Sequence, residues 1–253
     1  KPIVATSSIS NFNIKQSYNY IELSKVFDTI LNLAFSSGTC PNHRDPLILH
    51  FRIMSSNCKM FDNFADLFIK NNRLNSRTLE KKYSYEYSEN NNSLNLTAEP
   101  VKKFKDKIII ALDTKNSLYR NTKLEEYVNI STSSIYLKLL KFNDVKQTYD
   151  FNFEDYNKKN MSIVIPDLQS NSNNYNFMIP KNYGCQFMAM SFQNNNSNLQ
   201  QYNNFFKNER YGYVLKPENL RHIPLTIPNP TKQDPQLSYA PRNFKTDYYN
   251  YEI

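Results

Sequence analysis

The residues NYGCQFMAMSFQ at positions 182–193 and GYVLKPENLR at positions 212–221 decide the fold of this 253-residue chain. The first block alternates large apolar residues with small or polar ones, which predicts a strand over 185–193 that packs on a layer of helices. The second block, with the residue before it, predicts a final strand or extended segment over 211–217. Each block contains one of the three glycines of the chain, Gly184 and Gly212.

Glycine is scarce in this chain and asparagine is abundant. Average usage predicts about 18 glycines at this length, whereas the sequence has three glycines and 37 asparagines. Asparagine replaces glycine in turns because it tolerates the left-handed conformation, but it cannot do so where a Cβ does not fit. Three scattered glycines exclude a Gly-rich phosphate loop and a dinucleotide fingerprint, so nucleotide hydrolysis is disfavoured.

The charged and sulfur-containing residues exclude further classes. The net charge of +8 is spread along the chain, and we interpret the basic cluster at 102–107 as a solvated strand entrance rather than a nucleic-acid patch. Cys40, Cys58 and Cys185 form no C-x-x-C pair, which disfavours a disulfide framework and structural zinc and favours a reducing compartment. No apolar run approaches the roughly 20 residues of a membrane span.

Hydrophobic periodicity predicts alternating helices and strands. Apolar stripes indicate amphipathic helices over 21–35 and 59–70, and a short helix is expected over 200–207. Continuous apolar runs predict buried strands over 46–53, 107–113 and 161–165. This order is typical of a parallel α/β sheet, with a polar surface connection over 71–100 and a Pro/Tyr-rich extended arm over 222–253.

The two opening blocks resemble the second catalytic half, the Y region, of the eukaryotic phosphoinositide-specific phospholipases C. That family carries S-S-N-Y, then G-C-Q-φ-V-A-φ-N-F-Q and G-Y-V-L-K-P-x-F-L-R, in the order and at the spacing found here from residue 173 to 221. Residues 160–166, NMSIVIP, also lie where that half of the family carries an L-S-R-V-Y-P stretch. More weakly, residues 45–52 resemble the family's Y-P-V-I-L-S-L-E strand, and residues 97–110 and 1–10 resemble neighbouring segments.

The resemblance covers residues 1–221 and implies a TIM-like (β/α)8 barrel of the phospholipase-C type that is incomplete at its N-terminus. Residues 1–70 would be the end of the X half, 71–96 a polar linker loop, and 97–221 the remainder and the Y half. Residues 222–253 would be a separate Pro/Tyr-rich extended tail.

The polar positions that carry the family's chemistry are changed in this chain. The family uses two histidines and a calcium ion held by carboxylates to cleave a phosphodiester. The resemblance places Ala5 at the second histidine, Arg52 at a calcium-binding glutamate, Ala111 and Asp113 at two headgroup lysines, and Gln169 at a headgroup arginine. A headgroup tyrosine is kept as Tyr175, which we interpret as a packing residue rather than a ligand contact.

The packing motifs of the family are retained, so the resemblance implies that the fold is kept and the chemistry lost. These motif residues are Gly184, Cys185, Gln186, Gly212, Lys216 and Pro217. We interpret His43, His50 and His222 as structural histidines and Cys185 as an inert core residue. We therefore expect a pseudoenzyme that holds no metal or cofactor, with residues 222–253 docking on other proteins of an assembly. Nucleic acid is not expected as a partner, and a lipid headgroup is expected only as a weak one.

Three functions remain in competition at this stage. The first is a non-catalytic structural or binding module in the cytoplasm or in a virus particle, since Asn-rich, Gly-poor composition indicates AT-rich coding as in some large DNA viruses. The second is the C-terminal part of an active calcium-dependent phosphodiesterase, favoured by the Lys1 start and opposed by Ala5 and Arg52. The third is headgroup binding without cleavage, with Arg52 as the counter-charge to phosphate.

Overall fold

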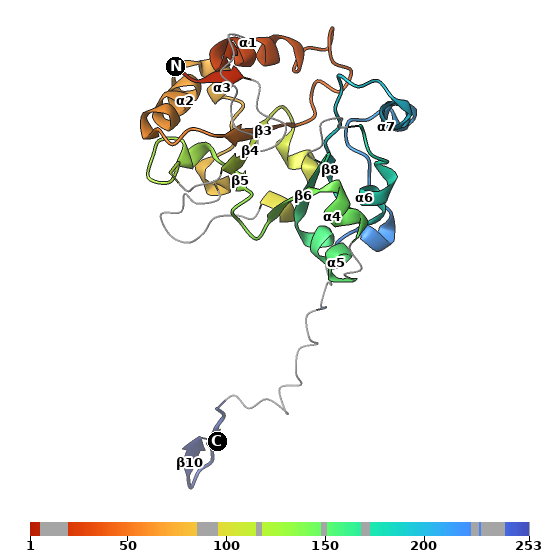
Figure 1. The fold of residues 1–253 in the computed structure, drawn as a ribbon. Coiled ribbons are helices and arrows are strands. Elements are labelled where there is room, and N and C mark those ends of the chain that lie inside the picture. Colours follow the sequence, from red (N-terminus) through yellow and green to blue (C-terminus); the bar gives the residue numbers. More distant parts are fainter. Residues whose placement is uncertain are drawn as a thin grey trace. The chain divides into compact units, whose positions relative to one another are not determined.

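The computed structural model describes residues 1–5, 20–84, 96–114, 118–147, 151–167, 173–223, 228 and 241–252. The chain divides into two units, Lys1–His222 and Ile223–Ile253, one residue from the boundary expected from the sequence. The first unit contains the parallel strands and the long helices (Figure 1).

The first parallel sheet has the strand order β3-β4-β5. Strands β3 (Leu47–Ile53) and β4 (Ile108–Thr114) pair along their whole length, and β5 (Ile130–Ser131) continues the sheet. The predicted strands over 46–53 and 107–113 are therefore confirmed to within one residue. The β-branched apolar residues of these strands favour a pleated sheet with one face packed against other elements.

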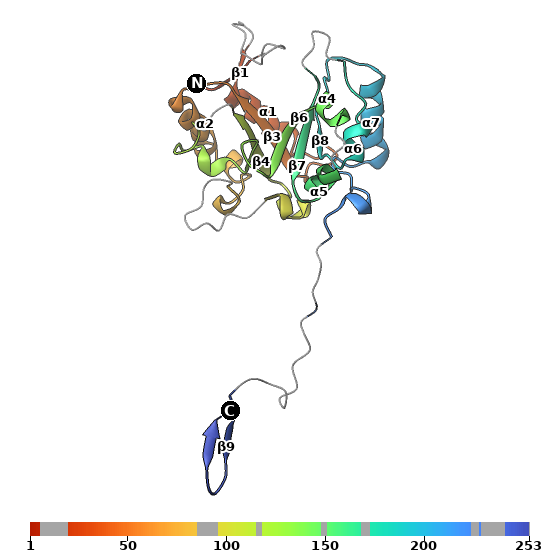
Figure 2. The ribbon, with the colours of Figure 1, turned by 60° about the horizontal axis from the view of Figure 1, so that its bottom comes forward.

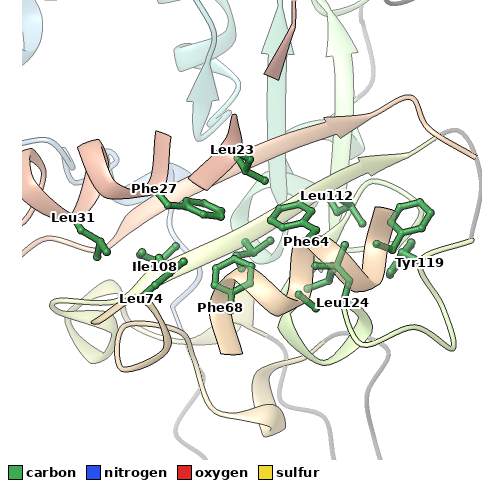
Figure 3. Close-up of a cluster of buried hydrophobic side chains, with 14 residues drawn as sticks. Leu23, Phe27, Leu31, Phe64, Phe68, Leu74, Ile108, Leu112, Tyr119 and Leu124 are labelled. Carbon is green, nitrogen blue, oxygen red and sulfur yellow. The ribbon is translucent and has the colours of Figure 1, made fainter. Parts of the chain in front are cut away.

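Two amphipathic helices cover the outer face of this sheet. Helices α1 (Leu23–Leu33) and α2 (Cys58–Lys70) confirm the two predicted helices, and the Asn57 side chain caps α2 by accepting from the Lys59 amide at 3.1 Å. Their apolar stripes meet outward side chains of β4, such as Ile108 and Leu112, in one cluster (Figure 3), and side chains of β3 pack against it. Its buried members include Phe27, Leu31, Phe64, Phe68, Leu74, Ile108, Ile110, Leu112, Tyr119 and Leu124.

The second parallel sheet has the order β6-β7-β8, from Leu137–Lys141, Met161–Ile165 and Phe187–Met188. Strand β7 confirms the prediction over 161–165. Helices α4 (Phe142–Lys146), α5 (Phe151–Lys159), α6 (Met178–Asn182) and α7 (Ser197–Glu209) follow its strands. Their second core cluster consists of Val145, Phe153, Val164, Tyr175, Phe177, Cys185, Met190 and Leu199.

Two predictions around β8 are corrected. The strand expected over 185–193 is only two residues long. The Asn174 side chain occupies the hydrogen-bonding groups of Ser191 that a longer strand would use. Its Oδ1 accepts from the Ser191 amide at 2.6 Å, and its Nδ2 donates to the Ser191 carbonyl at 3.1 Å. Of the two alternatives predicted for 211–217, a strand or an extended segment, the strand does not form. Helix α7 is longer than predicted. The Asn196 side chain caps its start by accepting a hydrogen bond from the Leu199 amide.

Apolar side chains between the two sheets form the interior layer. Ala111, Ile130, Leu137 and Ile163 are buried there, and Ile48, Leu139, Met161, Ile165 and Phe187 pack against them. In Figure 2 the strands of both sheets stand side by side, with α2 on one flank and α6 and α7 on the other. Parallel strands around an apolar interior with helices outside define an incomplete α/β barrel of the TIM type.

The N-terminal segment departs from its expected place. The resemblance includes residues 1–10 in the barrel region, but β1 (Ile3–Ala5) pairs antiparallel with β2 (Tyr20–Glu22), with Ala5 opposite Tyr20. Within the described residues this ribbon forms a separate sheet from β3 and β4. The Leu23 amide donates to the Pro2 carbonyl at 3.1 Å, which ties the ribbon to the start of α1.

The polar stretch over 71–100 is partly helical where the structure describes it, at residues 71–84 and 96–100. It contains α3 (Asn72–Asn75) and short 3-10 helices at Lys81–Tyr83 and Leu96–Ala98. Leu74 and Leu96 are buried, so these isolated apolar residues anchor an otherwise polar segment to the core. The most loop-like residues of the prediction, 89–93, lie outside the described residues.

The second unit contains a small antiparallel hairpin of β9 (Asn243–Lys245) and β10 (Asn250–Glu252). The Phe244 and Tyr251 rings stack across it with centroids 5.5 Å apart, and the Thr246 amide donates to the Tyr249 carbonyl at 2.8 Å in its turn. The prediction of a wholly extended arm is therefore wrong for 243–252. All six strand residues are exposed, so this hairpin encloses no core of its own.

Candidate functional site

The inner face of β3 and β4 ends in an ion pair at the carboxyl edge of the strands. Arg52 and Asp113 are register partners, and the Arg52 Nε lies 2.7 Å from the Asp113 Oδ2. Side chains alternate along a strand, so both point to the same face as Ile48, away from the helices. The two side chains are only 24% and 17% exposed, which places the pair in a partly desolvated environment.

The Asp113 carboxylate is engaged through both oxygens. Its Oδ1 accepts a hydrogen bond from the Thr132 hydroxyl, just after β5, at 3.2 Å, while its Oδ2 accepts from Arg52. Three adjacent strands thus contribute to one polar cluster at the edge where barrel enzymes carry their chemistry. Within this pair the guanidinium and the carboxylate offset each other's charge.

His50 belongs to the same face, which sequence reasoning missed. It precedes Arg52 by two residues on β3 and is exposed rather than buried, so the strand is not covered on both faces. Partial burial by surrounding protein atoms lowers the pKa of His50, Asp113 raises it, and Arg52 lowers it further. The interpretation of His50 as a buried structural histidine is therefore corrected. The alternation of side chains along 46–53 was the signal that could have found it.

The other sequence-identified positions are dispersed. Ala5 lies in the antiparallel ribbon, and Ala111 is buried in the apolar interior opposite Ile130. Gln169 falls outside the described residues. The Tyr175 hydroxyl donates to the Val164 carbonyl at 2.9 Å, and its ring stacks on Phe142 with centroids 4.6 Å apart.

Burial raises the pKa of Tyr175, in agreement with its packing role. Its hydroxyl is used by the backbone of β7 rather than directed toward Arg52 and Asp113. The structure therefore brings Arg52 and Asp113 together, with Ala111 two residues before Asp113 on the same face of β4, and it leaves Ala5 and Tyr175 in other settings.

The retained motif residues form a polar network behind the second sheet. Gln186 Nε2 donates to the carbonyls of Asn157 and Asn160, and its Oε1 accepts from the Ser162 amide at 2.9 Å. The Ser162 hydroxyl in turn donates to the Asn157 Oδ1 at 2.6 Å. Asn157 and Ser162 are fully buried, so this network fixes α5 against β7 and β8. Sequence reasoning did not identify either residue.

The glycine, cysteine and lysine of the motifs surround Asn157. Gly184 has φ of +75°, and a Cβ there would lie 3.5 Å from the Asn157 Cβ, so the position favours glycine. The Asn157 Nδ2 lies 3.7 Å from the Cys185 Sγ, and burial raises the pKa of that thiol to about 12. Lys216 Nζ donates to the Asn157 carbonyl at 2.7 Å.

The second motif block also contacts the first sheet. The Tyr213 hydroxyl donates to the Pro46 carbonyl at 2.7 Å, and a Cβ at Gly212 would lie 3.7 Å from an Asp45 carboxylate oxygen. Pro217 caps the 3-10 helix Glu218–Leu220. These contacts connect residues more than 160 positions apart, so the block ties the last part of the first unit to the beginning of β3.

The described residues form neither a metal-binding cluster of His, Cys, Asp or Glu side chains nor a helix that could span a membrane. Among them, no group of three or more His, Cys, Asp or Glu side chains is arranged to hold a metal ion. None of the helices in the described part of the chain is long and apolar enough to cross a membrane.

Two solved structures have an architecture similar to that of this chain. The crystal structure of L. pealei PLC21 superposes with a TM-score of 0.63 at 18% identity, over 83% of this chain and 31% of that chain. The crystal structure of S. officinalis PLC21 gives a TM-score of 0.59 at 16% identity, with the same coverage. This chain therefore shares its fold with these structures, and in this chain the α/β barrel of the phospholipase-C type is incomplete.

The family model of the phosphatidylinositol-specific phospholipase C Y domain matches residues 107–219. This part of the chain is therefore similar to the Y domain of the phosphatidylinositol-specific phospholipases C. The 1-phosphatidylinositol 4,5-bisphosphate phosphodiesterase delta-4 of Xenopus laevis is 37% identical over 84 residues, and the beta-2 protein of Mus musculus is 36% identical over 86. The matches cover 33% of this chain but only 11% and 7% of those relatives.

Proposed function

We propose that the first unit is a non-catalytic phospholipase-C-like module that acts by binding other proteins. The observation that carries this proposal is the Arg52–Asp113 ion pair on the inner face of the barrel. The resemblance places a calcium-binding glutamate at Arg52 and a headgroup lysine at Asp113, so both charges are inverted in this chain. The two inversions compensate each other, because the residues face each other across β3 and β4.

Calcium binding is opposed by the geometry of this pair. Calcium takes six to eight oxygen ligands, and here a guanidinium stands where a carboxylate would contribute. The Asp113 oxygens already accept from Arg52 and Thr132, so a cation would have to displace both donors. These contacts support loss of the metal-dependent reaction.

Headgroup binding without cleavage is less well supported than a structural role. It requires the Arg52 guanidinium to exchange the Asp113 carboxylate for a phosphate. The nearby Ala111 offers no charge and lies among apolar side chains. His50 lies on the same face, but partial burial by surrounding protein atoms lowers its pKa and thereby disfavours the cationic form that would attract a phosphate.

Isothermal titration of the full chain with calcium and with inositol 1,4,5-trisphosphate tests this proposal. We expect no heat of binding from either ligand in the unmodified chain. The matched variant R52E restores a carboxylate at the position, so calcium-dependent heat in R52E alone would identify Arg52 as the block. Saturable binding of both ligands by the unmodified chain would contradict the proposal and favour the active-enzyme alternative.

We further propose that residues 222–253 provide the contact with partner proteins. The hairpin exposes Phe244, Tyr249 and Tyr251, and aromatic residues are enriched in the centres of protein interfaces. Residues 223–253 contain three basic and three acidic residues, so this segment has no excess charge to attract an anionic surface. Cross-linking mass spectrometry in the native source should find links from 241–252 to another protein, and the F244A/Y251A variant should lose them.

A structural role in a virus particle is the more specific form of this proposal. It rests on the asparagine-rich, glycine-poor composition of the chain. Fractionation of the native source would test it, since the chain should copurify with particles rather than with free proteins.

A further inference from the structure

Lys216 has an unusual environment for a cation. Its Nζ donates to the Asn157 carbonyl at 2.7 Å, in the last turn of α5, which lies beside the segment that follows Lys216 (Figure 1). An ammonium group carries three donors. Within the described part of the chain, this carbonyl is its one hydrogen-bond acceptor and no carboxylate pairs with it.

The neighbours of the Lys216 Nζ provide little compensating charge. Gly184 has no side chain, and a Cβ there would lie 3.6 Å from the Nζ, so the amine lies against bare backbone. Cys185 is the titratable group that interacts with Lys216, and burial raises its pKa to about 12, which keeps it a neutral thiol near pH 7. The carbonyl end of α5 favours a positive charge, but burial of Lys216 is the larger effect and lowers its pKa to about 8.

We propose that Lys216 is a site of acylation by small activated acyl donors such as acyl thioesters and acyl phosphates. The lone pair of the neutral Nζ attacks the acyl carbon and forms an N–C bond. The C–S or C–O bond to the leaving group breaks, a thiolate or phosphate departs, and the Nζ proton passes to solvent. Lys216 is only partly buried, and the reaction requires a donor small enough to reach its Nζ.

The product matches the site better than the ammonium does. An acylated lysine has a single N–H, and the site supplies one carbonyl, that of Asn157, to accept it. The modification also removes the charge that burial disfavours. Acylation should therefore preserve the connection between α5 and the segment 212–217.

The expected preference can be set from the proton equilibrium. At pH 7.5 about a quarter of an amine with a pKa of about 8 is neutral, compared with about 0.1% of an ordinary lysine with a pKa near 10.4. A less basic group is a weaker nucleophile, which reduces this roughly 200-fold advantage to about 10-fold. Lys216 should therefore react about ten times faster than exposed lysines.

Competitive labelling of the full chain with trace acetic anhydride tests the inference. The rate at Lys216, measured by mass spectrometry, should exceed the rates at the exposed Lys59 and Lys207 about 10-fold at pH 7.5, and it should level off above pH 8. Acetyl phosphate should modify Lys216 first. The K216R variant, which keeps a donor but cannot be acylated by this route, confirms the assignment of the labelled peptide.

Two results would overturn the inference. One is labelling of Lys216 no faster than of Lys59 and Lys207, or a rate that keeps rising through pH 10. The other is a lower melting temperature for chains acetylated at Lys216 than for unmodified chains, which would show that the amide does not fit. Both measurements use the unmodified sequence, so neither depends on whether K216R folds.

Discussion

Replacement of Arg52 by methionine removes the ion pair on which the proposed function depends. The variant keeps a long unbranched side chain but removes the guanidinium that lies 2.7 Å from the Asp113 carboxylate. Asp113 then retains only the Thr132 hydroxyl of its two described donors. A hydrogen bond to a charged group contributes about 1.5–3 kcal/mol, and this pair lies between an exposed pair and a fully buried one.

We therefore expect R52M to lower the free energy of unfolding by about 2 kcal/mol. For a chain of this size the melting temperature should fall by about 4–8 °C. Urea denaturation of R52M, D113N and the double variant gives the coupling energy of the pair, which should be about 1–2 kcal/mol.

The chain supplies a matched control in the Arg44–Asp106 pair. Its atoms are 3.1 Å apart, but its side chains are 65% and 41% exposed. Asp106 has φ of 62°, which asparagine tolerates, so D106N is a suitable partner for R44M. The coupling energy of this exposed pair should be below about 0.5 kcal/mol. A coupling at Arg52–Asp113 no larger than at Arg44–Asp106 would refute the reasoning.

Four further outcomes are expected. G184A should lose about 1–2 kcal/mol of stability because its φ of +75° strains any Cβ, whereas G38A, where a Cβ would meet only the Ser36 hydroxyl at 3.9 Å, should change little in urea denaturation. F68A should cost about 3–5 kcal/mol, since Phe68 is fully buried, and the neighbouring I69A, 45% exposed, should cost below about 0.5 kcal/mol in the same assay. The Cys185 thiol, with a pKa of about 12, should react with Ellman's reagent at pH 8 roughly 1000-fold more slowly than a free peptide thiol, and at the free rate after denaturation. Burial lowers the pKa of Lys216 to about 8, so between about pH 8 and pH 10.4 the unfolded chain binds more protons at this residue than the folded chain does. The free energy of unfolding of the unmodified chain, relative to that of K216M, should therefore rise with pH across this window.

The strongly periodic parts of the sequence predicted the fold well. The apolar stripes of α1 and α2 and the run of β7 identify their elements because one side of each is buried in a single layer. Helix α5 (FNFEDYNKK) carries few apolar residues and was missed, since its place is fixed by Asn157 and Gln186 rather than by a stripe. The hairpin at 243–252 was also missed, because a threonine turn at Thr246 replaces the glycine that usually marks such turns.

The candidate site was predicted only in part. The family resemblance identified Arg52 and Asp113 one by one, but not that they are register partners, because strand register depends on long-range pairing. The prediction of a buried strand over 46–53 treats the segment as one continuous apolar run and overlooks that His50 and Arg52 share one face of the strand. The network around Asn157 joins α5, β7 and the segment 212–217, and no local pattern marks such non-local hydrogen bonds.

The most direct test of the account is a turnover measurement. The full chain is incubated with phosphatidylinositol 4,5-bisphosphate in mixed micelles, with and without calcium, and release of water-soluble inositol phosphate is followed. The account predicts release no faster than in the enzyme-free control under both conditions. Calcium-dependent release that is abolished by R52M would contradict it, because Arg52 would then serve the reaction rather than block its metal.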